Sequence, residues 1–177
     1  MTKLLPLLLS LLIAPLALAQ DAAQFDVGGF RFTRPAEWKS VPVTSPMRKA
    51  QLAVPAADAG GTAAEVTFFT FGGNAGGVDA NVQRWIRQFD APAGTEKVEK
   101  KEISGTKVTL VTTEGTFQSG MPGGPTTPMT NYALHGAILD AGQDLVFIKM
   151  TGPAAVVKGA GKQFAEMIEK AAGSKAK

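Results

Sequence analysis

Four consecutive apolar residues at positions 145–148 constrain the fold more than any other segment of the chain. Successive side chains of a strand point to opposite faces of its sheet, so this segment presents apolar groups on both faces. A second predicted strand places Val66 and Phe68 on one face and Phe69 and Phe71 on the other, which requires either a β-bulge or burial on both faces. Burial on both faces is typical of interior strands. We therefore expect a central sheet that is covered on both sides.

The other strands are predicted from alternating hydrophobicity and from the turn residues that bound them. Ser104 and Gly105 separate the two strands of one hairpin, and residues 140–142 separate those of another. The strand that begins at Phe30 is stopped by Pro35, because proline cannot donate a hydrogen bond to a strand ladder. The predicted strands are residues 30–33, 47–54, 64–71, 97–103, 106–117, 131–139 and 143–150.

Two helices are predicted from apolar residues that recur at spacings of three and four. In the first helix Val82, Trp85 and Phe89 form the buried face, and Asp79 is expected to be the N-cap. The closing helix opens at Pro153, because proline is tolerated at the first helical position. These elements predict the α+β class, with an antiparallel-rich β-sheet flanked by helices.

Residues 1–19 have the three parts of a secretory signal peptide: a positive start at Lys3, an apolar run, and small residues before Gln20. The run is shorter than the ~20 residues that span a bilayer, so cleavage is favoured over a membrane anchor. We expect an exported mature protein, periplasmic or extracellular, without a membrane span. Residues 20–177 are then predicted to form one α+β domain with a frayed tail from about residue 173.

The composition argues against several classes of function, including nucleic-acid binding, thiol chemistry and metal binding. The chain carries 18 basic and 15 acidic side chains, a formal net charge of +3, and its lysines are mixed with glutamates, as in residues 96–102. This pattern does not favour nucleic-acid binding, which needs a basic patch or stripe. The chain has no cysteine, so disulfides, thiol chemistry and cysteine-based metal sites are excluded. No carboxylate or histidine spacing typical of metal ligands occurs, so neither a metal nor a cofactor is expected.

The segment 29–38, Gly-Phe-Arg-Phe-Thr-Arg-Pro-Ala-Glu-Trp, resembles the opening of PsbP-like and Mog1-like domains, which begin with a Phe-x-Phe strand, a proline and a tryptophan. The later order of strands, helix, hairpins and closing helix is also similar. The resemblance implies a PsbP/Mog1-like α/β sandwich and a binding or accessory role without built-in catalysis. Residues 44–50 and 64–69 also look like a group of small exported bacterial proteins with no assigned role. None of the families' functional residues maps onto this chain.

Residues 118–130 are rich in glycine and proline and are predicted to form a long loop between two strands. Loops of this length in compact domains are mobile or functional, and methionine side chains there would provide an adaptable apolar surface. A passive connection is the alternative interpretation. The predicted binding residues are Met121, Met129 and Tyr132, with Arg48 and Lys49 as polar contacts.

His135 is the single histidine, so a hydrolytic triad would have to use it. It is predicted on a strand, on the face opposite Tyr132, and the chain has no Gly-x-Ser-x-Gly nucleophile elbow. A structural or surface histidine is the favoured interpretation, and His135 remains a weak catalytic candidate. The glycines of residues 72–77 lie between a strand and a helix, but they match neither the Walker nor the Gly-x-Gly-x-x-Gly pattern.

These observations favour an exported, non-enzymatic binding or accessory protein that recognises a partner protein or an envelope component. Two alternatives stay open. One is an exported hydrolase-like enzyme that uses His135, and the other is a structural envelope protein. Whether the chain is an enzyme is therefore uncertain from the sequence, with a non-enzymatic role favoured. Both tryptophans, Trp38 and Trp85, are assigned to the core, although a surface Trp38 would mark a partner site.

Overall fold

The structure is a computed structural model that describes residues 24–72, 76–120, 124–140, 142 and 144–174. The predicted signal peptide, Met121 and the end of the predicted frayed tail lie outside these residues. The elements in chain order are β1 (Gln24–Val27), β2 (Phe30–Thr33), β3 (Lys39–Ser40), β4 (Arg48–Val54), β5 (Ala64–Gly72), α1 (Val78–Ile86), β6 (Phe89–Asp90), β7 (Lys97–Ile103), β8 (Thr106–Gly120), β9 (Thr126–Asp140), β10 (Asp144–Pro153), α2 (Ala154–Gly159) and α3 (Gly161–Gly173).

An antiparallel sheet of eight strands forms the centre of the molecule, with the order β3-β4-β5-β10-β9-β8-β6 and β7 paired to β8. The strand that carries residues 145–148 is β10, and it lies between β5 and β9. The prediction of an interior strand is therefore confirmed. β1 and β2 form a separate two-stranded sheet, so the strand predicted at residues 30–33 does not join the central sheet.

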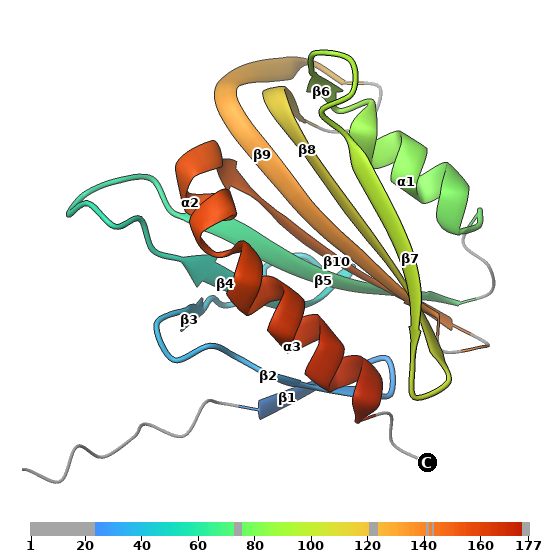
Figure 1. Ribbon diagram of the computed structural model, residues 1–177. Helices are drawn as coiled ribbons and strands as arrows, with labels where there is room; N and C mark the ends of the chain where they lie inside the picture. Colours follow the sequence, from blue (N-terminus) through green and yellow to red (C-terminus); the bar gives the residue numbers. More distant parts are fainter. Residues whose placement is uncertain (1–23, 73–75, 121–123, 141, 143, 175–177) are drawn as a thin grey trace, which may run out of the picture.

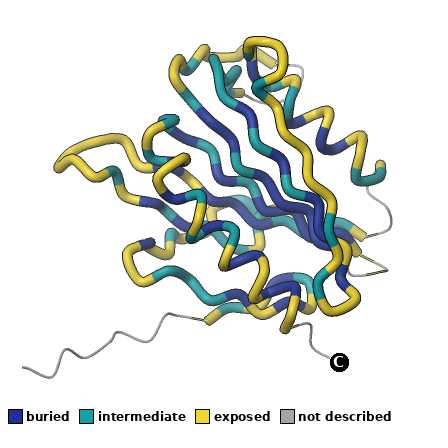
Figure 2. The backbone as a smooth tube through the Cα atoms, viewed as in Figure 1, coloured by how far each residue is buried: buried dark blue, intermediate teal, exposed yellow. Residues whose placement is uncertain are grey.

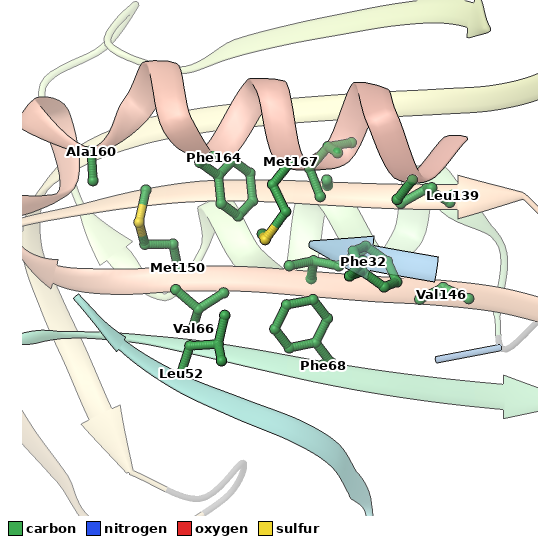
Figure 3. Close-up of a cluster of buried hydrophobic side chains, with 14 of the residues drawn as sticks. Phe32, Leu52, Val66, Phe68, Leu139, Val146, Met150, Ala160, Phe164 and Met167 are labelled. Carbon is green, nitrogen blue, oxygen red and sulfur yellow. The ribbon is translucent and has the colours of Figure 1, made fainter. Parts of the chain in front are cut away.

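One face of the sheet is covered by α2, α3 and the β1–β2 hairpin (Figure 1). Phe164 and Met167 of α3 pack toward the sheet residues Phe68 and Val146, with Phe32 of β2 beside them (Figure 3). Trp38 also belongs to this cluster, since it is 1% exposed and its Nε1 donates a hydrogen bond of 3.1 Å to Gln163 Oε1. The prediction that Trp38 is a core residue is confirmed.

The opposite face is covered in part by α1. Trp85 contacts Phe147 edge to face, with ring centroids 6.1 Å apart, and it lies against Gly136 of β9, where an added Cβ would be 2.5 Å from Cζ3 of the indole. The surrounding cluster includes Leu134 and Phe69. Figure 2 shows the middle of the sheet buried and the outer side of α1 exposed. Both faces of the sheet therefore bury apolar side chains, so Phe68 and Phe69 need no bulge in β5, whose ladder with β10 is regular there. The register shift opposite these two residues lies in β4, between Arg48 and Ala50.

The helix boundaries differ from the predictions in three ways. The N-cap of α1 is Gly77, and Asp79 lies within the first turn. Phe89 belongs to β6, and its ring lies 5.0 Å from that of Phe117. Pro153 ends β10, and the closing helix is divided at Ala160 into α2 and α3, a region where glycines on both sides weaken the helix.

The prediction of a long loop at residues 118–130 is wrong, because paired strands occupy most of that segment. β8 continues to Gly120 and β9 begins at Thr126, with Gln118 opposite Pro128 in the ladder. β10 reaches β9 only as far as Tyr132, so the first part of β9 has one neighbouring strand. Proline is tolerated at such an edge because one side of the strand needs no donor.

Candidate functional site

The candidate site is a groove of about 390 Å³ on the α1 face of the sheet. Alternation along β10 places Lys149 and Thr151 on the same face as Phe147, which packs against α1. Residues of β4, β5, β8 and β9 complete the walls. We call this hollow the Lys149 groove, and its main lining residues are Arg48, Glu65, Phe69, Gln88, Phe117, Met129, Tyr132, Lys149 and Thr151.

Lys149 is the distinctive group of the groove. Its Nζ donates a hydrogen bond to Oε1 of Gln88 and lies 4.9 Å from the centre of the Phe117 ring. The described residues provide no ion-pair partner for it within 4.0 Å. Burial lowers the pKa of Lys149 to about 8, opposed by the nearby charge of Glu65 and assisted by that of Arg84. Lys149 is therefore a partly desolvated cation with neutral direct partners.

The other charges of the groove are already paired. Arg48 Nη1 lies 2.7 Å from Glu65 Oε1 and 2.6 Å from Gln51 Oε1. Gln51 Nε2 in turn donates a hydrogen bond of 2.7 Å to the same glutamate oxygen. These contacts hold the guanidinium and the carboxylate at the β4–β5 edge of the groove, where both remain partly exposed.

The structure brings together three of the five predicted binding residues. Arg48, Met129 and Tyr132 line the Lys149 groove. Lys49 does not line it and is exposed on β4, and Met121 lies outside the described residues. That these residues bind a partner stays a prediction.

The sequence reasoning missed Lys149 and Thr151, which β10 contributes to the groove. A signal for Lys149 was present, because it is the single charged residue of β10 after Asp144. A charged side chain within an otherwise apolar interior strand is rare unless it has a partner or a task.

His135 lies on the opposite face of the sheet, beneath the start of α3. A Cβ added to Gly161 would be 2.7 Å from Cε1 of its ring, and the Phe164 ring lies 6.2 Å away at a steep angle. Two hollows of about 230 and 330 Å³ lie beside His135, and no serine is among the residues that line them. Their carboxylates are Glu99 and Glu114, and Glu114 is paired with Lys158 at 2.9 Å. Burial lowers the pKa of His135. These surroundings fit a structural histidine and do not favour the hydrolase alternative.

A larger hollow of about 600 Å³ lies at the start of α1, near the glycine-rich segment considered for anion binding. Three lysines line it: Lys100 pairs with Asp79 at 2.7 Å and Lys101 with Glu169 at 2.6 Å, whereas Lys107 has no ion pair among the described residues. Residues 73–75 of that segment lie outside the described residues. Because the carboxylates of Asp79, Glu102 and Asp140 line it together with the three lysines, this hollow has no excess of charge and has a weaker case as an anion site than the Lys149 groove.

Two features are absent from the described residues. No three of their histidine and acidic side chains gather as metal ligands would. None of their helices is both long enough and apolar enough to cross a membrane.

No protein-family model matches the chain, and no curated protein matches its sequence. Among solved structures, cyanobacterial PsbP (CyanoP) from Synechocystis sp. PCC 6803 is similar over 85% of this chain and 91% of its own, with 11% identity and a TM-score of 0.53. A protein of Bacteroides thetaiotaomicron matches 87% of this chain and 47% of its own, with 15% identity and a TM-score of 0.47. PA94 of Pseudomonas aeruginosa, a protein of unknown function, matches 84% of this chain and 94% of its own, with 10% identity and a TM-score of 0.45. The chain therefore has a PsbP-like α+β fold, as its sequence predicts.

Proposed function

We propose that the chain is an exported, non-enzymatic binding or accessory protein, and that the Lys149 groove holds its partner protein or an envelope component. The observation that carries the proposal is the groove itself, in which the partly desolvated cation of Lys149 lies among aromatic side chains. Ligand sites combine mostly apolar walls with a few polar groups in this way. The PsbP-like fold supports an accessory role, although a fold alone does not determine function.

Export rests on the N-terminal sequence. Residues 1–19 carry the positive start, apolar run and small terminal residues of a signal peptide. The expected address is the periplasm or the extracellular space. Fractionation of cells that express the full chain with a C-terminal tag tests this, because export predicts the tag outside the cytoplasm and processing near residue 19.

Capture from an envelope extract tests the binding role, with two adjacent residues as a matched pair. Arg48 lines the groove and Lys49 does not. Full-length tagged protein should retain a reproducible partner, Arg48→Ala and Tyr132→Ala should reduce its recovery several-fold, and Lys49→Ala should leave it unchanged. Equal recovery by all four proteins, or a partner lost only with Lys49→Ala, would remove the groove from the proposal.

A further inference from the structure

The Lys149 groove has an excess of positive charge. Arg48 and Glu65 neutralise each other at 2.7 Å, whereas the direct partners of Lys149 are the neutral Gln88 and the Phe117 ring. Arg84 adds further positive potential to the ammonium. One negative charge beside Lys149 would balance the groove. A partly desolvated ammonium strengthens such a contact because the surrounding dielectric is low.

A second group of the groove, the hydroxyl of Thr151, has no hydrogen-bond partner among the described residues. Oγ1 of Thr151 is buried without a hydrogen bond among the described residues, and Thr151 lies two positions after Lys149 on the same face of β10. A buried hydroxyl without a partner is unfavourable, because it has lost its hydrogen bonds to water and gained none in return. Rotation of the Thr151 side chain about χ1 would turn this buried hydroxyl toward an acceptor oxygen placed beside Lys149, and that oxygen would then satisfy both side chains.

The walls of the groove are largely apolar, which favours a ligand with an apolar body as well as a charge. Phe69, Phe117, Met129 and Tyr132 line it with aromatic and thioether surface, and the Phe117 and Tyr132 rings stack with centroids 6.3 Å apart. The volume of about 390 Å³ lies at the small end of the range of roughly 300–1,000 Å³ for small-molecule sites. Because Arg48 and Glu65 neutralise each other, Lys149 is the one net positive charge of this lining, which favours a ligand with a single negative charge.

We propose that the Lys149 groove binds a small monocarboxylic acid with an apolar body, whose carboxylate is held by Lys149 and Thr151 and whose body lies on Phe69, Phe117 and Tyr132. This inference rests on the proposed binding role and specifies the ligand of the same site. The carboxylate accepts hydrogen bonds from the ammonium and the hydroxyl, and charge-assisted bonds of this kind are the stronger ones.

The test is isothermal titration of the purified full chain with sodium octanoate below the concentration at which it forms micelles. Acetate carries the charge without the body, and 1-octanol carries the body without the charge. We expect saturable binding of octanoate at one site, with acetate and octanol at least tenfold weaker. Lys149→Met should weaken octanoate binding at least tenfold, and Lys49→Met should not change it.

Two further measurements keep the test decisive if Lys149→Met does not fold. Thr151→Val, which keeps the charge, should weaken octanoate binding several-fold. Binding by the unchanged chain should also weaken as the pH rises through about 8, where Lys149 loses its proton. The other charged or titratable groups near its ammonium are Arg48, Glu65 and Tyr132 in the lining and Arg84 of α1. Absent binding, equal affinity for octanol, or unchanged affinity in Lys149→Met or Thr151→Val overturns the inference.

The outcome is separable from that of the proposed function. A protein partner captured through Arg48 and Tyr132 without octanoate binding would remove the carboxylate inference and leave the binding role. Octanoate bound through Lys149 with no captured partner would support the inference and redirect the proposed function from a protein partner to a small envelope component.

Discussion

Replacing Lys149 with methionine should stabilise the protein at neutral pH. Burial lowers the pKa of Lys149 from 10.5 to about 8, which corresponds to roughly 3 kcal/mol of unfavourable free energy while the ammonium is charged in the folded state. The variant also loses the hydrogen bond to Gln88 and the contact with Phe117, together worth about 1–2 kcal/mol. Lys149→Met should therefore raise the free energy of unfolding at pH 7 by about 1–2 kcal/mol.

The pH dependence supplies the sharper part of this prediction. The unfolded chain keeps the ordinary lysine pKa, so between about pH 8 and 10.5 it binds more protons than the folded chain. The free energy of unfolding of the unchanged protein should consequently rise across that window because of Lys149. The unfavourable contribution is complete below pH 8 and absent above 10.5. The advantage of Lys149→Met should thus shrink and then disappear as the pH rises.

Urea denaturation, followed by tryptophan fluorescence at several values between pH 7 and pH 10, measures both quantities. Taking the difference between the unchanged protein and the variant cancels the other titrating groups. Lys158→Met is the matched control, because Lys158 is exposed and pairs with Glu114, so its effect should stay within about 0.5 kcal/mol at every pH. A variant that is less stable at pH 7, or a difference that does not change with pH, would refute the reasoning.

Three further predictions concern the remainder of the fold. Gly136→Ala should lower the free energy of unfolding by about 1–3 kcal/mol, because its Cβ would meet the Trp85 ring at 2.5 Å; an effect below 0.5 kcal/mol in urea denaturation would mean that α1 moves aside freely. Thr106→Val should lower the free energy of unfolding by about 1 kcal/mol, because a buried hydrogen bond to the Ala172 carbonyl of α3 is lost. Thr113→Val should leave the free energy of unfolding unchanged or raise it, because that hydroxyl has no partner among the described residues. If urea denaturation showed Thr113→Val to be the more destabilising of the two, the hydrogen-bond assignment would be contradicted. Burial lowers the pKa of His135 below 6.5, so the unfolded chain binds more protons as the pH falls through that value, and stability should decline there; His135→Gln should lack this decline, and parallel pH curves for the two proteins would contradict it.

Local patterns predicted much of the strand content. Alternating side chains placed Val66 and Phe68 opposite Phe69 and Phe71, and the apolar run at 145–148 indicated an interior strand. Both follow from the two-residue period of a strand, which depends on the chain alone. The short strands β1, β3 and β6 were missed. β3 and β6 have two residues each, which is too few to establish a period.

The candidate site was predicted only in part. Arg48, Met129 and Tyr132 were singled out for their residue types, and they line one groove. Met129 was expected to lie in a long loop, whereas the structure pairs it with Phe117 in the β8–β9 ladder. Gln118 and Pro128 pair in a hairpin. The hairpin was not predicted from the sequence, because its strands contain glycine and proline, which are usually found in turns.

The sequence by itself determined the strand periodicity, the absence of thiol chemistry, the candidate signal peptide and the oddity of one lysine in an apolar strand. Only the tertiary structure decided the sheet order β5-β10-β9-β8, which gathers Glu65, Lys149, Tyr132 and Phe117 from segments far apart in the chain. It also decided that Lys149 has no carboxylate partner within 4.0 Å among the described residues. The physical reason is that strand pairing and desolvation arise from contacts between distant segments, and local propensity does not encode those contacts.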